Sequence, residues 1–237
     1  MVNHFLGGRV AVRQPADGFR SGLDAVMLAA AVPARAGDHT LELGAGSGAA
    51  SFCLAERVPD CRVTAVEIDA AFAGLIRENA QTNRAAVEAV CADIFALPQG
   101  LKREYAHVFC NPPFHDGEAS PDPARDRALR DTGRFAEWME TGLTRTVSGG
   151  TFTTILRADR LGDALAALPA TGITIFPLWP RAGEPAKRVI VQATKGARTP
   201  LALLGGLVLH ETDSRYTREA DAVLRDGASL ALESRRL

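Results

Sequence analysis

Residues 40–57 constrain the fold of this chain more than any other stretch. An apolar run, Thr40 to Leu43, leads into Gly44-Ala45-Gly46-Ser47-Gly48, and a segment with helical spacing of apolar residues follows up to Arg57. This order predicts a buried strand, a turn whose glycines permit close approach to the backbone, and a helix that begins at the turn. Strand and helix patterns alternate again downstream. The sequence therefore predicts an α/β fold with a mostly parallel sheet covered on both faces.

The remaining strands are expected downstream, and the last two should be antiparallel because only a short connection joins them. They are expected at residues 62–66, 87–91, 105–110, 150–156, 173–176 and 188–193. We predict a seven-stranded, doubly wound, mostly parallel, Rossmann-like sheet with an antiparallel C-terminal strand. One more strand is expected over 203–209 and a last helix over 217–224.

The N-terminal residues are expected to form a small appendage. Residues 1–36 should contain a hairpin with a turn at Pro15–Gly18 and a helix from Asp24 to Val32, and should cap the ligand site. Residues 37–237 should form the main domain. The length of 237 residues fits this single domain with its appendage.

The composition indicates in which cellular environment the protein works and which ligands it is not expected to bind. No apolar stretch is long enough to cross a bilayer and the first residues lack the plan of a signal peptide, so we expect no membrane association and a cytoplasmic location. The four cysteines have no CxxC spacing, which favours reduced thiols over disulfides or a metal site. They are Cys53, Cys61, Cys91 and Cys110. The net charge of −1 indicates no strong field for nucleic acid, and the oligomeric state stays undetermined.

Acidic residues stand where predicted strands end, and parallel strands bring those ends to one edge of the sheet. Glu67 suits a ribose diol, and Asp93 suits the amino group of an adenine. NAD fits both, but the glycines lack the G-x-x-G step of the dinucleotide fingerprint. Glu42, just before the glycines, suits a cationic amino-acid end. These features favour S-adenosylmethionine as the cofactor.

The segment Asn111-Pro112-Pro113-Phe114 follows the strand predicted over 105–110. Two prolines make a rigid corner with few backbone donors. Asn111 Oδ1 and the Pro112 carbonyl are two acceptors for an exocyclic NH2 group, and Phe114 is placed to stack on its ring. The segment predicts a clamp for a planar amino or amide group.

Together these motifs resemble the class I S-adenosylmethionine-dependent methyltransferases that act on nitrogen, and more closely the tRNA (adenine-N6) methyltransferases of valine tRNA. Residues 18–29, 180–192 and 216–220 also resemble that family. The resemblance implies N6 methylation of an adenosine beside the anticodon, a tRNA substrate, and Arg20 and Asp24 at the methionine end of the cofactor. It also implies a cofactor site made of Arg20, Asp24, Glu42, Gly44, Ala45, Gly46, Glu67, Ile68, Asp93, Ile94 and Asn111, and a catalytic segment of Asn111, Pro112, Pro113 and Phe114.

Alternatives remain at this stage. The same clamp fits a protein glutamine N5-methyltransferase, or a DNA adenine or other amino-group methyltransferase; an NAD-dependent oxidoreductase and a non-catalytic RNA-binding module are further readings. His107 stands where the family usually has Asp, and His115 is a candidate proton relay. Arginines after the clamp are predicted to border the RNA. They are Arg125, Arg127, Arg130 and Arg134.

Overall fold

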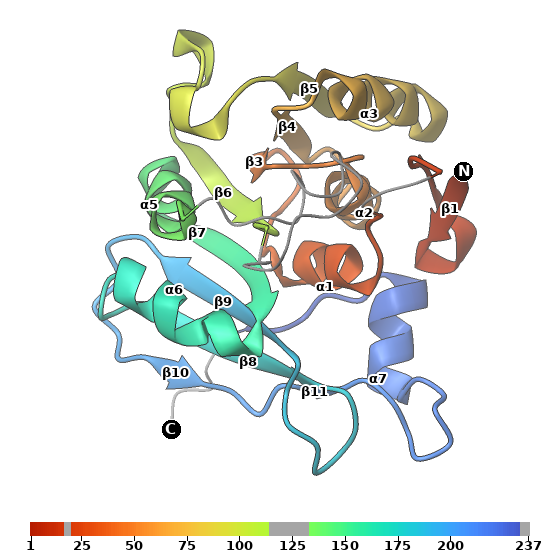
Figure 1. Cartoon of the computed structure of the whole chain (residues 1–237), viewed down its shortest axis with the longest axis vertical. Coiled ribbons are helices and arrows are strands. Elements are labelled where there is room, and N and C mark those ends of the chain that lie inside the picture. Colours follow the sequence, from red (N-terminus) through yellow and green to blue (C-terminus); the bar gives the residue numbers. More distant parts are fainter. Residues whose placement is uncertain (17–19, 114–132, 233–237) are drawn as a thin grey trace.

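A nine-stranded sheet forms the centre of the molecule in the computed structural model, which describes residues 1–16, 20–113 and 133–232 (Figure 1). The strand order is β10-β8-β9-β7-β6-β3-β4-β5, with β11 also pairing with β8. The strands are β3 (His39–Leu43), β4 (Arg62–Glu67), β5 (Val87–Cys91), β6 (Tyr105–Cys110), β7 (Thr146–Arg157), β8 (Ile173–Trp179), β9 (Arg188–Thr194), β10 (Ala202–Leu203) and β11 (Leu207–Val208).

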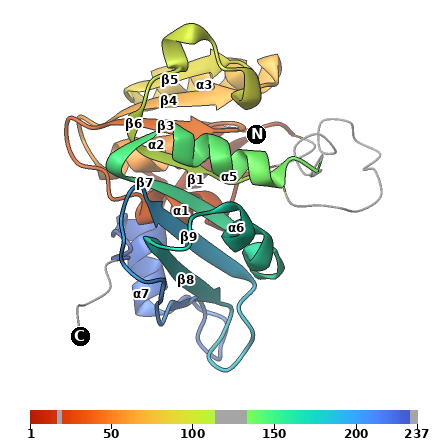
Figure 2. The same ribbon diagram turned by 90° about the vertical axis from the view of Figure 1, so that its left-hand side faces the viewer.

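The predicted mostly parallel sheet is confirmed. Strands β3 to β7 pair in parallel, whereas β9 runs antiparallel to both β7 and β8. Figure 2 shows β9 and β8 on the opposite side of β7 from β6 and β3. The carboxyl ends of β3 to β7 therefore share one edge, and β9 begins at that edge.

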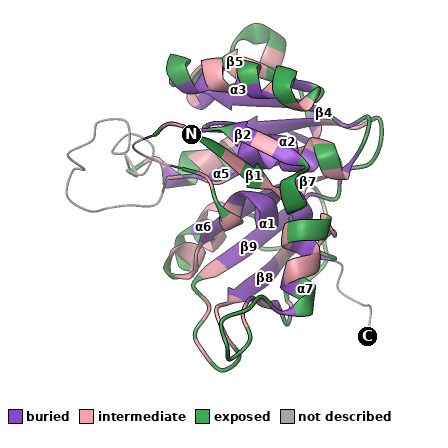
Figure 3. Ribbon diagram, turned by 90° about the vertical axis from the view of Figure 1, so that its right-hand side faces the viewer, coloured by how far each residue is buried: buried purple, intermediate pink, exposed green. Residues whose placement is uncertain are grey.

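Helices cover both faces of the sheet, as alternation in the sequence predicted. The helices α1 (Leu23–Ala31), α2 (Ala49–Arg57) and α3 (Ala70–Asn83) lie on one face, and α5 (Phe135–Thr144) and α6 (Leu161–Ala167) on the other. Successive residues of a strand point to opposite faces. On β6, Phe109 joins the core under α1 and α2, whereas Val108 and Cys110 join the core under α5. Figure 3 shows the buried residues concentrated in the strands and inner helices.

The C-terminal part departs from the predicted elements. The single strand expected over 203–209 is two short strands, β10 and β11, each parallel to β8. Gly206 between them has φ of 78°, and a Cβ there would lie 2.2 Å from the Pro177 carbonyl oxygen, which explains the interruption. The last helix is α7 (Arg218–Asp221), continued by a π-helical turn over Ala222–Asp226.

The N-terminal hairpin exists, but its predicted turn is wrong. Its strands are β1 (Val2–Phe5) and β2 (Val10–Arg13), so the turn lies at Leu6–Gly8 and not at Pro15–Gly18. Gly7 and Gly8 both have positive φ, which glycine tolerates in a tight turn. Residues of α1 share one buried cluster with the sheet. The division at residue 36 stays a prediction.

Free thiols are found at all four cysteines, and Cys91 alone of these is exposed. None of the described helices combines the length and apolar character that a membrane crossing requires.

Candidate functional site

The carboxyl edge of β3, β4, β5 and β6 gathers the residues that the sequence singled out. The amide of Ala45 donates to the Val66 carbonyl at 3.0 Å, so the turn after β3 is joined to the end of β4. The amide of Ala92 donates to the Glu67 carbonyl at 3.0 Å, which joins the segment after β5 to the same edge. Leu43 lies opposite Cys110, so Gly44 and Asn111 follow directly after the ends of two neighbouring strands.

The glycine loop (Gly44–Gly48) is shaped by close neighbours. Gly44 and Gly48 have φ of 66° and 84°, in the left-handed region. A Cβ on Gly44 would lie 2.5 Å from Trp138 Cη2, and one on Gly48 would lie 2.7 Å from Phe52 Cε2. A side chain would clash at both positions, so the loop keeps a bare backbone where a ligand can approach the start of α2.

Glu67 closes this loop from the neighbouring strand. Its Oε2 accepts a hydrogen bond from the Gly46 amide at 2.8 Å, and its Oε1 accepts one from the Asp69 amide at 2.9 Å. Burial raises the pKa of this carboxyl, and the backbone hydrogen bonds oppose that effect. Each oxygen keeps a lone pair for a hydroxyl donor. Ile68 beside it is 66% exposed, an apolar surface without cover among the described residues.

Asp93 has a similar arrangement one strand further. Its Oδ1 accepts from the Phe95 amide at 2.9 Å and caps a 3₁₀ turn over Ile94–Ala96, where Ile94 is buried. The carboxylate is thereby held at the sheet edge beside an apolar residue. This fits a polar contact to the edge of a heterocycle with apolar packing against its face.

Glu42 is hydrogen-bonded within the fold. Its Oε2 accepts hydrogen bonds from both the amide and the hydroxyl of Ser51 on α2, and the residue is only 4% exposed. Burial raises its pKa to about 8, because the charged carboxylate is desolvated. Contact between Glu42 and the cofactor stays a prediction, since the structure gives this carboxyl an internal partner.

Asn111 carries a buried acceptor that the fold does not use. Its Oδ1 is buried, and no hydrogen-bond donor among the described residues reaches it. Leaving such an atom unsatisfied costs about 1–3 kcal/mol, a penalty that native proteins usually avoid outside functional sites. A ligand NH2 group would satisfy it. Pro112, next in sequence, is buried and Pro113 half-buried.

The other predicted residues of this segment lie outside the described residues. They are Phe114, His115, Arg125, Arg127 and Arg130. Arg134 is described: its guanidinium pairs with Glu137 and lies 3.6 Å from the centre of the Phe95 ring.

Two aromatic side chains, Trp138 and Phe95, lie beside the glycine loop, and the sequence analysis did not identify them. The indole of Trp138 on α5 packs against Gly44 and meets the Phe95 ring edge-on, with centroids 5.9 Å apart. Helical spacing identifies residues 135, 139 and 142 as the buried face of α5. That spacing carries no signal that the half-buried Trp138 would reach the loop after β3.

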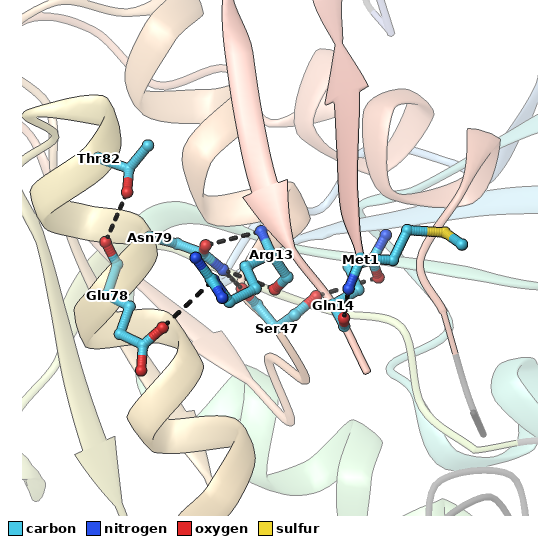
Figure 4. A network of polar contacts seen from close by, with 7 residues as sticks. All are labelled: Met1, Arg13, Gln14, Ser47, Glu78, Asn79 and Thr82. Carbon is cyan, nitrogen blue, oxygen red and sulfur yellow. Dashed lines mark hydrogen bonds and ion pairs between the residues drawn. The ribbon is translucent and has the colours of Figure 1, made fainter. Parts of the chain in front are cut away.

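The N-terminal hairpin is fastened to the glycine loop by buried amides (Figure 4). Asn79 on α3 bonds the amide and carbonyl of Arg13 at 2.7 and 3.0 Å and donates to the Ser47 carbonyl at 3.1 Å. Gln14 Oε1 accepts from the Ser47 hydroxyl at 3.2 Å and from the Ser21 amide at 2.7 Å. These bonds hold the chain before α1 over the glycine loop.

Arg20 and Asp24 follow this segment. The Arg20 guanidinium is exposed and approaches Met1 Sδ at 3.3 Å, whereas Asp24 Oδ2 accepts from Arg188 Nε at 2.8 Å. Asp24 therefore ties α1 to β9. Contact of either residue with a cofactor stays a prediction.

Comparison with known proteins agrees with this geometry. The family model of the methyltransferase small domain matches residues 21–137. A tRNA1(Val) (adenine(37)-N6)-methyltransferase from Klebsiella pneumoniae subsp. pneumoniae is 36% identical over 167 residues, 68% of each chain. One of the same name from Aeromonas hydrophila is 27% identical over 207 residues, which cover 83% of this chain and 84% of that one.

A solved structure supports the fold. A predicted O-methyltransferase from Agrobacterium tumefaciens is 30% identical, with a TM-score of 0.74, and the match covers 87% of this chain and 98% of that one. The matched family segment spans the glycine loop, Glu67, Asp93 and Asn111. The chain thus belongs to the S-adenosylmethionine-dependent methyltransferases, in the family of the tRNA1(Val) (adenine(37)-N6)-methyltransferases.

Proposed function

We propose that this protein methylates the N6 amino group of an adenosine in the anticodon loop of a tRNA, with S-adenosylmethionine as the methyl donor. The relatives named above are described as acting on adenine 37 of tRNA1(Val). The observation that carries the proposal is Asn111 Oδ1, a buried acceptor to which no described residue donates, at the edge that also carries the glycine loop. An exocyclic NH2 group supplies the missing donor.

The residues of the cofactor site fit a nucleoside with a charged tail. Glu67 would accept from the ribose hydroxyls and Asp93 from the adenine amino group, while Ile68 and Ile94 offer apolar contact. Gly44, Ala45 and Gly46 leave backbone exposed to the ligand, and Arg20 and Asp24 would lie toward its methionine end. When bound, the cofactor supplies a methyl group on a positively charged sulfur.

The chain contributes positioning and charge stabilisation. N6 of adenine is a weak nucleophile because its lone pair is delocalised into the ring. Asn111 Oδ1 and the Pro112 carbonyl would accept its two hydrogens and stabilise the positive charge that develops on nitrogen. Rigid prolines hold the acceptors in place, and alignment of a well-oriented pair contributes several kcal/mol. The target base has to leave its stack, which costs least in a single-stranded loop.

A labelling assay tests this function. The purified protein is incubated with methyl-labelled S-adenosylmethionine and a tRNA1(Val) transcript, its A37G variant, DNA or a protein extract. We expect label in the transcript alone, as N6-methyladenosine in the nucleoside digest. Label on glutamine, on DNA or on a ribose oxygen, or equal label in the A37G transcript, would overturn the proposal.

A further inference from the structure

Cationic side chains continue the sheet edge beyond Asn111. Because β9 is antiparallel, its first residues lie where β7 and β8 end, and Arg188 is opposite both Arg157 and Leu178. The Ala158 amide donates to the Lys187 carbonyl at 3.1 Å, which binds the two strand ends together. Arg181 follows two residues after the end of β8. We call Arg157, Arg181, Lys187 and Arg188 the basic edge.

Two of these cations oppose each other directly across β7 and β9, an arrangement that destabilises a sheet unless counter-charges are present. Arg188 has its counter-charge in Asp24 at 2.8 Å, a pair that is partly buried and links β9 to α1. Arg157 pairs with Asp159, two residues away, in a more exposed position. Exposed pairs contribute little to stability, so this guanidinium can exchange its partner for another anion.

The other two cations differ from each other: Arg181 is about as exposed as Arg157, and Lys187 is exposed. Arg181 Nη2 donates to the Ser214 hydroxyl at 2.8 Å, and its Nη1 lies 3.5 Å from Glu184 Oε1, a long ion pair. Lys187 is exposed and has no carboxylate at ion-pair distance in the part of the chain that the structure describes. Three of the four cations are therefore available to an external anion.

Charge changes sign along this edge. The half formed by β4 and β5 ends in the carboxylates of Glu67, Asp69 and Asp93, whereas the half formed by β7, β9 and β8 ends in the basic edge. Thr154 lies opposite Cys110, and Arg157 is three residues further, roughly 10 Å along the strand. Within one or two nucleotides of the clamp, a polyanion held at Asn111 meets carboxylates on one side. On the other side it meets guanidinium and ammonium donors, three of which have their own counter-charges in Asp24, Asp159 and Glu184.

We infer that the basic edge binds the phosphates that flank the target adenosine and so determines on which side of Asn111 the RNA backbone leaves. The inference rests on the proposed function. The guanidinium of Arg157 and that of Arg181 match phosphate with two parallel donors, and Lys187 adds a point charge. Such contacts position the substrate and read no sequence.

The test compares two triple variants of the full chain. R157Q/R181Q/K187Q removes three charges from the basic edge and leaves the Arg188–Asp24 pair intact. R62Q/K102Q/R103Q removes three charges at the opposite edge, where β4 and β6 begin. The affinity for a tRNA1(Val) transcript is measured over a series of salt concentrations, and the affinity for S-adenosylhomocysteine serves as the control for an intact site.

The first variant should bind tRNA at least about tenfold more weakly near physiological salt, and each lost contact should lower the slope of log K against log salt by roughly 0.7–0.9. The second should match the wild type, and cofactor affinity should be the same in all three. An unchanged slope in the first variant, or an equal loss in both, would overturn the inference. If the wild type methylates the transcript but the first variant shows no weaker binding, only the role of the basic edge is rejected. If the wild type methylates no tRNA, the proposed function is rejected as well.

Discussion

The proposed role of Asn111 lies in the chemical step and not in binding of the cofactor. Its amide oxygen is buried without a donor, so the fold itself gains nothing from this atom in the described structure. An acceptor kept in that condition is best explained by a group that arrives with the substrate. The functional consequence is an effect on turnover without a matching effect on cofactor affinity.

Replacing Asn111 by Ala should lower turnover by ~10²-fold or more, because one acceptor is lost at the nitrogen where charge develops. The affinity for S-adenosylmethionine should change little, since Glu67 and the glycine loop remain. Asn111→Asp keeps an acceptor oxygen and should retain more activity than the Ala variant. Single-turnover rates and calorimetric binding constants measure the two effects. Full activity of Asn111→Ala would refute the assigned role.

Burial changes the protonation of Glu42. Its pKa is raised to about 8, chiefly because burial disfavours the charged carboxylate. Between about pH 4.5 and 8 the folded state therefore holds a proton that the unfolded chain has released, and this group makes the protein less stable as pH rises.

Glu42→Gln keeps the shape and removes this titration. We expect the wild type to lose stability relative to Glu42→Gln, by up to a few kcal/mol, as pH rises from about 5 to 8. Urea unfolding of both proteins at several pH values measures the difference. Comparing the two proteins cancels the contribution of Glu67, whose pKa is also raised. A pH-independent difference in stability would contradict a buried, neutral Glu42.

Among the elements, α3 connects the N-terminal hairpin to the glycine loop through side-chain hydrogen bonds. Asn79 and Asn83 are one turn apart on the same face, and each bonds both backbone groups of one residue in β2. Only Asn79 also donates to the Ser47 carbonyl (Figure 4). The two asparagines are thus a natural matched pair.

Both Asn79→Ala and Asn83→Ala should destabilise the protein by about 1–3 kcal/mol each, because backbone groups of β2 lose their partners. Only Asn79→Ala should also weaken S-adenosylhomocysteine binding. Loss of the hydrogen bond that orders the glycine loop should reduce the affinity by about tenfold. Thermal unfolding and calorimetry give the two quantities. Equal loss of cofactor affinity in both variants would show that the hairpin, and not the bond to Ser47, matters.

At the scale of the whole molecule, the site joins parts that are distant in sequence and lie on opposite faces of the sheet. Trp138 comes from α5, whereas the glycine loop leads into α2 on the other face. The protein has two tryptophans, Trp138 and Trp179. Trp179 Nε1 donates to the Gly205 carbonyl at 3.0 Å, in the region of β8, β10 and β11.

Binding of S-adenosylhomocysteine should therefore change the fluorescence of Trp138 and not that of Trp179. In the Trp179→Phe variant, titration should alter the emission intensity or wavelength; in Trp138→Phe it should leave the emission unchanged. Saturating ligand should also raise the melting temperature, since a ligand at 100 times its Kd stabilises the native state by about 2.7 kcal/mol. A signal that follows Trp179 would place the cofactor elsewhere, and a melting temperature unmoved by the ligand would show that the ligand does not bind.

Local signals in the amino-acid sequence are sufficient to predict the class of fold and the order in which the parts of the site follow one another. Apolar runs, glycines and strand-end carboxylates are local signals, and parallel pairing brings Gly44, Glu67, Asp93 and Asn111 to one edge whatever the details. The antiparallel strand β9 followed from a short connection. The hairpin turn was misplaced because Leu6–Gly8 and Pro15–Gly18 carry similar turn residues, and local composition cannot choose between them.

Which side chains come into contact depends on tertiary packing. Trp138 contacts Gly44, Asn79 bonds to Ser47, and Arg157 lies opposite Arg188. The members of each pair are roughly 30 to 95 positions apart in the sequence. Tertiary packing also brings Glu42 to Ser51 and leaves the oxygen of Asn111 without a donor among the described residues. The physical reason is that periodicity states which face a residue occupies, whereas burial, charge state and hydrogen-bond satisfaction depend on what packs against that face.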